Sequence, residues 1–361
     1  MNNTKHYLSK EVFGTARLQM RAPNANVLLQ VDFEGLILES ELESALLTAS
    51  KKHVLLNSCI LVNEEKQASY HIKQTMKPDI RLINHDEDIN AIRKKALKKT
   101  FDIENGPLIR FYIVDDNHKS KLLICCHHAI CDGLSLIYLI KDIVNIIIKD
   151  DYDIEDNCKK ELTVIDNRVI PDSVKNGFIT KLIMKRIDKS VEKTDITITD
   201  DMMNEIHREF WLEHKNEIIT LDLLEEDTHK IISESKKNGV TVNSTMVTLF
   251  IKAQQTLLKP KSYSNNITIS VNFRDYMAQT PEDTVGFYAS AVRPQLDYSE
   301  KKSFWENAKM INKKIKSLIN EKSVFESQVI GLFNPKFIDA LVLAMFNQTD
   351  NDTALKMVRK K

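Results

Sequence analysis

Two adjacent histidines, His127 and His128, are the residues of this chain best placed to do chemistry. An imidazole has an unperturbed pKa of about 6.5, so it can take or give a proton close to neutral pH. The pair follows the apolar run Leu122–Cys126 and precedes Asp132, after which apolar residues recur at helical spacing. We therefore predict that both histidines lie on a strand-to-helix turn, where a rigid scaffold presents a side chain to a ligand.

Signals for several other kinds of chemistry are missing from the sequence. Its eight glycines form no clustered phosphate-binding loop, so a Rossmann or P-loop nucleotide fold is not expected, and no Gly-x-Ser-x-Gly hydrolase elbow occurs. Cys125, Cys126 and Cys131 beside the histidines suggest a metal, but no second ligand cluster exists, so we predict none. Cys131 could be a nucleophile, although a small packing side chain is the simpler interpretation.

The order His-His-x-x-x-Asp-Gly after a strand resembles the active-site motif of the condensation-domain superfamily of acyltransferases. That superfamily includes peptide-synthetase condensation domains, polyketide-associated acyltransferases, alcohol O-acetyltransferases and, more distantly, chloramphenicol acetyltransferase. Further segments are similar to parts of this family, and the resemblance extends over about residues 25–320. These segments are FDIENGPLIR at 101–110, VNFR at 271–274, VGF at 285–287, and a helix over 42–56 that ends in His-x-x-Leu at His53 and Leu56.

The resemblance implies roles for individual residues. His128 would be the general base that takes the proton of the attacking group, and His127 would orient the turn. Asp132 would form a buried ion pair with Arg274 that pins the loop. On backbone grounds, we also expect Gly133 to leave room for the acceptor and to place its amide, at the start of a helix, near the developing negative charge. A purely structural role for both histidines, satisfied within a packed loop, stays open.

The activity implied by the resemblance is acyl transfer from a CoA or carrier-protein thioester to a hydroxyl or amine. Donor and acceptor would be small molecules or carrier-tethered groups, and the thioester would be a co-substrate, with no cofactor bound permanently. Because no carrier or adenylation segment is visible, a free acyltransferase similar to the alcohol acetyltransferases is favoured. Three alternatives stay open: a peptide-bond-forming condensation protein of a natural-product pathway, a non-catalytic binding protein of the same fold, and a thioester or ester hydrolase.

Length and periodicity indicate an α/β protein with two lobes. The resemblance implies two chloramphenicol-acetyltransferase-like lobes, each a mixed sheet covered by helices, with the active site in the cleft between them. We place an N-terminal lobe at 1–170 and a C-terminal lobe at 171–361, because charges crowd in and periodicity weakens after residue 150. Strands are predicted near 27–33, 59–62, 69–72, 108–114, 122–126, 218–223, 267–273 and 287–292. Helices are predicted over 39–52, 89–99, 134–148, 177–187, 224–237, 241–258, 303–319 and 336–346.

Composition limits the compartment and the partners. The 51 basic and 51 acidic residues balance, so no net field favours nucleic acid, and the run KKALKK in a predicted helix is interpreted as a solvated face. Five cysteines, at 59, 125, 126, 131 and 158, show no disulfide spacing, and neither a leader nor an apolar run of transmembrane length occurs. We expect a cytoplasmic protein.

The end of the chain differs from the related proteins. They continue through further strands after the position of Ser323, whereas here only the helix 336–346 and a polar tail follow, so the C-terminal lobe is predicted to be shortened. Residues 347–361 offer few apolar side chains, so the tail is expected to pack weakly. A shortened lobe would expose apolar surface, which favours a companion chain, self-association or low activity. A carrier protein is a further possible partner.

Overall fold

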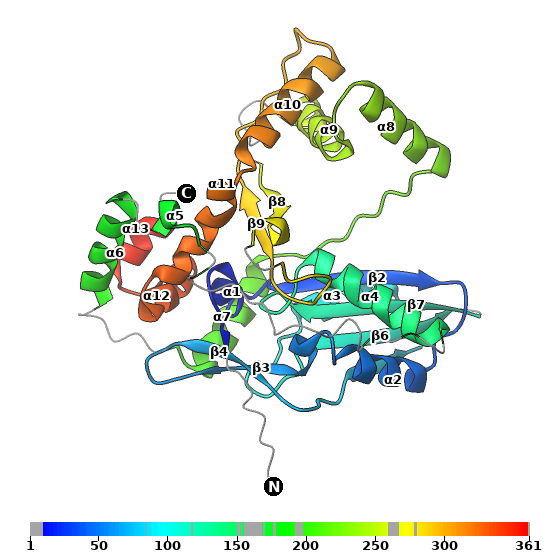
Figure 1. The fold of residues 1–361 in the computed structure, drawn as a ribbon, viewed down its shortest axis with the longest axis horizontal. Helices are drawn as coiled ribbons and strands as arrows, with labels where there is room; N and C mark the ends of the chain where they lie inside the picture. The colour runs from blue at the N-terminus through cyan, green and yellow to red at the C-terminus, as the bar shows by residue number, and fades with distance from the viewer. Residues whose placement is uncertain are drawn as a thin grey trace. The chain divides into compact units, whose positions relative to one another are not determined.

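The computed structural model shows a mixed α/β fold (Figure 1). It describes residues 10–84, 86–116, 118–149, 152, 154, 168, 170–175, 178–191, 198–258, 267–277 and 280–359. Two residues used in the sequence interpretation, Cys158 and Gly177, lie outside this set. The α/β class predicted from the sequence is confirmed.

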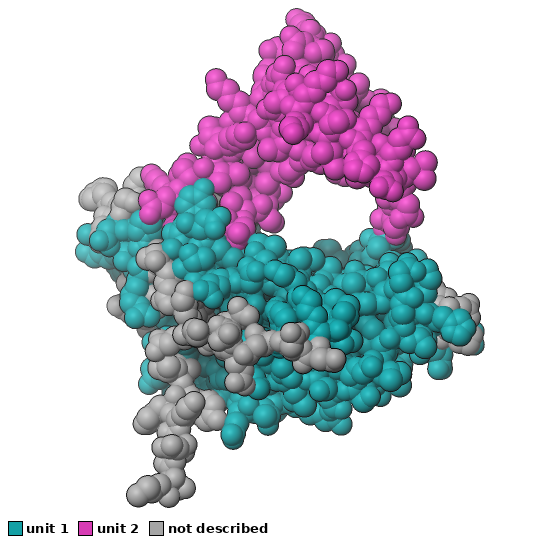
Figure 2. Space-filling model, turned by 45° about the vertical axis from the view of Figure 1, so that its right-hand side comes forward, with its two compact units in different colours: residues 1–218, 274–288, 328–361 teal, residues 219–273, 289–327 magenta. Residues whose placement is uncertain are grey.

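Two compact units divide the chain, and neither is continuous in sequence (Figure 2). Unit 1 contains residues 1–218, 274–288 and 328–361, and unit 2 contains residues 219–273 and 289–327. The lobe boundary predicted at residue 170 falls inside unit 1.

The histidine-bearing strand lies inside a four-stranded mixed sheet of unit 1. The strand order is β2-β7-β6-β5, where β7 is antiparallel to β2 and β6, and β5 is parallel to β6. The strands are β2 (Asn26–Phe33), β5 (Asp79–Ile83), β6 (Ile109–Asp116) and β7 (Lys119–His127). Every side chain from Leu122 to Cys126 is fully buried, as expected for a strand with neighbours on both edges and covered faces.

Helices α2 (Glu39–Ala49), α3 (Ile89–Lys98) and α4 (Gly133–Ile148) pack with this sheet, and α2 also packs on α4. They match the predicted helices 39–52, 89–99 and 134–148 closely. A second, antiparallel sheet has the order β1-β4-β3. Its strands are β1 (Lys10–Glu11), β3 (Ser58–Val62) and β4 (Ala68–Ile72), with the 3-10 turn Val54–Asn57 leading into β3.

Unit 1 also contains a helical cluster built from distant parts of the chain. Its members are α1 (Thr15–Gln19), α5 (Asp172–Lys175), α6 (Phe178–Val191), α7 (Asp200–Glu213), the 3-10 helix Ser327–Leu332, which starts in unit 2, α12 (Pro335–Met345) and α13 (Asp352–Arg359). Helix α7 was not predicted, because its charged residues mask the apolar face formed by Met202, Met203, Ile206 and Phe210.

Unit 2 contains four helices and a two-stranded antiparallel sheet among its described residues. These elements are α8 (Glu225–Lys237), α9 (Val242–Leu257), β8 (Ile269–Asn272), β9 (Ala289–Val292), α10 (Phe304–Leu318) and α11 (Glu321–Glu326). The predicted strand at 218–223 is wrong. Its apolar alternation is typical of a strand, but the segment pairs with no strand among the described residues, and Ile219 and Leu221 are 90% and 81% exposed.

No single helix in the described part of the chain is long and apolar enough to span a membrane; the bent pair Glu321–Leu332 and Pro335–Met345 reaches that length and composition only when taken together.

The C-terminal tail packs against unit 1, which corrects the expectation of a weakly packed end. Helix α13 contacts α12 and α6, and its Ala354 is completely buried in the helical cluster. Leu355 and Val358 pack against the same core. The few apolar residues of the tail are spaced to fall on one face of a helix, so a low apolar count was misleading.

Substitution of Ala354 by lysine tests the docking of the tail. A long cationic side chain in this filled position should lower the free energy of unfolding by about 2 kcal/mol. Met357, on the same helix but 38% exposed, provides the matched control, and Met357→Lys should stay close to the parent. Urea unfolding followed by circular dichroism measures both. Equal midpoints for the two variants would contradict the packing of α13.

Candidate active site

The two histidines lie where β7 ends and the turn toward α4 begins. Backbone hydrogen bonds hold this turn on both sides: His127 N–H donates to the Leu108 carbonyl at 2.9 Å, and His128 N–H donates to the Ala25 carbonyl at 2.7 Å. The buried Tyr70 hydroxyl donates to the Ala129 carbonyl at 2.6 Å. The turn is therefore fixed by three separate segments of the chain.

The contacts of the His128 ring determine its tautomer. Its Nδ1 lies 2.7 Å from the carbonyl oxygen of Cys131. A carbonyl oxygen can only accept, so Nδ1 carries the proton and Nε2 keeps a lone pair. The ring also packs edge-on against Phe287, with centroids 5.0 Å apart, and is half-buried. In the neutral form of the ring, Nε2 is therefore the nitrogen with the free lone pair.

The His127 ring has the opposite proton arrangement. Its Nδ1 accepts the backbone N–H of Ala129 at 3.2 Å, so in the neutral ring the proton is on Nε2. Burial, reinforced by the charges of His128 and Arg110, lowers the pKa of His127 to about 4. His127 therefore remains neutral at pH 7 and contributes to the turn as an acceptor.

Asp132 and Arg274 are brought together in the structure. Arg274 Nη1 lies 3.1 Å from Asp132 Oδ2, and both side chains are buried. The same Oδ2 accepts the backbone N–H of Tyr288 at 2.9 Å, while Oδ1 caps α4 by accepting the Ser135 N–H at 2.7 Å. The guanidinium stacks over the Tyr288 ring at 4.4 Å. A buried carboxylate with this many donors is well compensated for its lost hydration.

Residues 285–288 are held at successive positions by hydrogen bonds that the sequence analysis did not predict. The Ser135 hydroxyl lies 2.6 Å from the Gly286 carbonyl and accepts the Gly286 N–H at 3.2 Å. The Val285 N–H donates to Nδ1 of the fully buried His53 at 3.1 Å. Together with Tyr288 on Asp132, these bonds fix the segment that carries Phe287 against His128.

His53 is anchored in turn by Asp142 of α4. The His53 Nε2–H donates to Asp142 Oδ2 at 2.9 Å, and burial lowers the pKa of His53 despite this neighbour. Asp142 also accepts from Lys52 at 2.6 Å and from the Tyr152 hydroxyl at 2.6 Å. Burial opposes its ionisation, but these bonds outweigh it and hold the pKa of Asp142 well below its usual range. The His-x-x-Leu pattern pointed to His53 in the sequence, but it did not indicate the bond between His53 and Asp142.

Gly133 is the first residue of α4, and the fold itself does not require glycine there. A Cβ at this position would meet no atom within 4 Å, and the residue is exposed. A side chain at 133 would therefore obstruct only a bound molecule. This agrees with the expectation that Gly133 leaves room for an acceptor, whose role stays a prediction.

The cysteines around the turn are buried. Burial, with the neighbouring Cys126 thiol, raises the pKa of Cys131 well above its ordinary value, so a thiolate there is disfavoured. Within the described residues, no three His, Cys, Asp or Glu side chains converge in a way that could hold a metal ion.

Part of the chain is similar to known condensation domains. Residues 27–152 match the family model of the condensation domain. Two curated relatives align with about a third of the chain. They are a hybrid PKS-NRPS synthetase of Xenoacremonium sinensis, 31% identical over 122 residues, and nonribosomal peptide synthetase 32 of Fusarium pseudograminearum, 28% identical over 128 residues. The alignments cover 33% and 35% of this chain but only 3% and 1% of the relatives.

A solved structure extends the likeness beyond the matched segment. The first condensation domain of the calcium-dependent antibiotic synthetase, solved with a substrate analogue, superposes with a TM-score of 0.62 at 11% identity. The superposition covers 93% of this chain and 78% of that one. The fold is therefore that of a condensation domain.

A double-mutant cycle tests the coupling of Asp132 to Arg274. Asp132→Asn and Arg274→Ala each leave a buried group without its charged partner, so each should lower the free energy of unfolding by about 3 kcal/mol or more. The double variant should cost less than the sum, because neither charge remains unpaired. Urea unfolding of the four proteins gives the coupling energy, and additive effects would show that the two side chains do not meet.

The depressed pKa of His127 makes stability depend on pH. In the unfolded chain His127 binds a proton at about pH 6.5, whereas the folded value is about 4. Stability is therefore complete above pH 6.5 and falls as pH drops toward 4, by about 3 kcal/mol in total. His127→Asn keeps an acceptor for Ala129 without titrating, so its unfolding free energy should fall less steeply between about pH 6.5 and 5. The exposed His71→Asn is the control, and parallel curves would be inconsistent with the shift.

Proposed function

We propose that this protein is a transferase that moves an acyl group from a thioester to a hydroxyl or amine, because residues 27–152 match the family model of the condensation domain. The observation that carries the proposal is the 2.7 Å bond between His128 Nδ1 and the Cys131 carbonyl. This bond leaves the lone pair on Nε2 of a half-buried, oriented imidazole, as a general base near neutral pH requires.

In the proposed reaction, His128 carries one proton between two partners. Its Nε2 takes the proton of the acceptor hydroxyl or amine as the acceptor attacks the thioester carbonyl carbon. Electrons move onto the carbonyl oxygen and return as the carbon–sulfur bond breaks, and the leaving sulfur takes the proton from Nε2. The products are an ester or amide and a free thiol. No permanently bound cofactor is needed, because the thioester is already activated.

The other residues of the turn position this base. Asp132 and Arg274 hold residues 285–288, so that Phe287 supports the imidazole. His127 fixes the backbone of the turn through Ala129. Gly133 leaves the start of α4 open to the acceptor, and its amide is the donor that we assign to the developing oxyanion.

Two donors are compatible with this chemistry, CoA thioesters and carrier-protein thioesters. The curated relatives are named as peptide and hybrid polyketide-peptide synthetases, which supports a carrier-tethered donor and an amine acceptor in peptide-bond formation as the second candidate. In either case a carrier protein or CoA occupies the donor side, and His128 has the same role.

Substitution of His128 by alanine should reduce acyl transfer by about a hundredfold to ten-thousandfold, because the proton acceptor is lost. The fold should be retained, since the ring is only half-buried. His71→Ala removes an exposed histidine from β4 and should behave as the parent. Release of free thiol from acetyl-CoA and from a loaded carrier protein, with a panel of alcohols and amines, measures the rate. A His128→Ala protein with parental turnover would refute the mechanism.

The same assay separates the competing functions. Thiol release that requires an acceptor supports transfer, and the nature of the accepted nucleophile separates ester from amide formation. Release that is independent of any acceptor would indicate a hydrolase acting on water. No release from any donor would indicate a binding protein of the same fold.

A further inference from the structure

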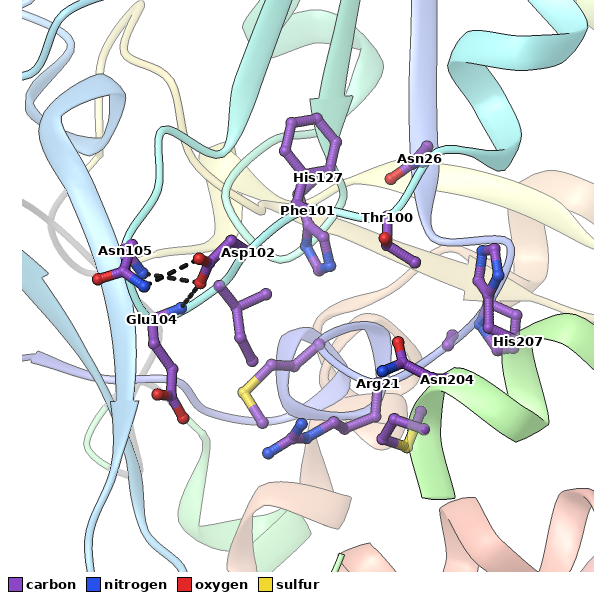
Figure 3. Close-up of a pocket in the computed structure, with 15 residues that line it drawn as sticks. Arg21, Asn26, Thr100, Phe101, Asp102, Glu104, Asn105, His127, Asn204 and His207 are labelled. Atoms are coloured by element: carbon purple, nitrogen blue, oxygen red, sulfur yellow. Dashed lines mark hydrogen bonds between the residues drawn. The ribbon is translucent and has the colours of Figure 1, made fainter. Parts of the chain in front are cut away.

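A cavity of about 400 Å³ lies in unit 1 on the His127 side of the turn, and the mechanism does not use it (Figure 3). It is framed by the chain after α1, the start of β2, residues 100–105 and α7. Its volume is within the range of small-molecule sites. His128 does not line it, so it is distinct from the proposed basic nitrogen.

His127 presents a hydrogen-bond donor to this cavity. Its Nδ1 is occupied by the Ala129 N–H, so the proton of the neutral ring is on Nε2, and the ring points into the cavity in Figure 3. Within the described part of the chain, no protein acceptor binds that Nε2 proton. A ligand acceptor would satisfy it.

Arg21 supplies a cation without a protein partner in the described structure. Its guanidinium makes no hydrogen bond or ion pair with the described residues, and its Nε is buried without a partner. Asp339, the carboxylate that interacts electrostatically with Arg21, is already bonded to Arg17. A guanidinium left unpaired at the wall of a cavity is complementary to an anion.

The cavity wall is held in place before any ligand binds. The Asn26 amide donates to the Leu97 and Lys99 carbonyls at 2.9 and 3.0 Å, and Arg110 stacks on Phe101 at 3.8 Å while it donates to the Thr100 carbonyl. Phe101 in turn packs edge-on against His127. Such a pre-formed wall lowers the entropy lost when a ligand binds.

In the described structure, neither acidic side chain of the lining is hydrogen-bonded to Arg21 or His127. Asp102 accepts the backbone N–H groups of Glu104 and Asn105 and the Asn105 side-chain amide, which leaves its carboxylate satisfied. Glu104 is exposed, and Figure 3 places it with Asp102 and Asn105 along one side, opposite Asn204 and His207. They leave Arg21 and His127 free to bind an anionic group.

We propose that this cavity binds the carboxylate group of a small organic acid, held by the Arg21 guanidinium and the His127 Nε2–H. A carboxylate has acceptor oxygens for both donors and the charge to pair with the arginine. The remaining lining, which includes Met20, Phe101 and Met203, contacts the body of the molecule. This site stands apart from acyl transfer, because neither donor is the proposed base.

Binding of matched acids and amides tests the proposal. Phenylacetate and N-acetylphenylalanine, each compared with its primary amide at fixed ionic strength, are titrated into the full chain and followed by protein NMR and calorimetry. At least one acid should bind about tenfold more tightly than its amide. Equal affinities of acid and amide, or no binding of any of the four probes, would overturn the proposal without the need for a variant.

Variants then locate the site. Arg21→Gln should abolish the preference for the acid, and Arg21→Lys should keep part of it. His127→Asn should lower the affinity for the acid, although it keeps the contact of the turn with Ala129. The exposed Arg208 of α7 does not line the cavity, so Arg208→Gln is the matched control and should bind as the parent. His128→Ala should also bind normally, which separates this site from the proposed activity. An Arg21→Gln protein with an intact acid preference, and a folded circular dichroism spectrum, would refute the assignment.

Discussion

The buried carboxylate of Asp132 is the group on which the local architecture depends. One of its oxygens caps α4, and the other accepts from Arg274 and from the backbone of Tyr288. An ion placed at 4% exposure is tolerable only when its oxygens are saturated by donors, so three segments must converge correctly before it is stable. The position of Phe287 against His128 follows from that requirement.

Neighbouring histidines in this turn have complementary proton arrangements, although their residue types are identical. A carbonyl acceptor places the His128 proton on Nδ1, while a backbone donor places the His127 proton on Nε2. One ring thus offers a lone pair and the other an N–H. Two main-chain groups within the same short turn are enough to divide the roles, which shows how backbone geometry can assign chemistry without any additional charged side chain.

The strand, turn and helix around His127 were predictable because their signals are local: an apolar run, a capping aspartate and helical periodicity. The pairing of Asp132 with Arg274 came only from the family resemblance, since nothing in a single sequence reports a contact between distant residues. The hydrogen bonds of His53 and Ser135 to residues 285–286 were not predicted, for the same reason. Strand β5 was not predicted because its short, charged sequence carries no clear strand signal. Its strand conformation depends on parallel pairing with β6. The cavity at Arg21 combines segments that no periodicity links.

The long separation between Asp132 and Arg274 has a consequence for the newly made protein. The arginine is synthesised 142 residues after the aspartate that it stabilises. At ribosomal rates this delay is on the order of ten seconds. During that time the Asp132 carboxylate has no Arg274 to pair with, so the turn that carries both histidines reaches its final, fully paired state only after most of the chain has been made.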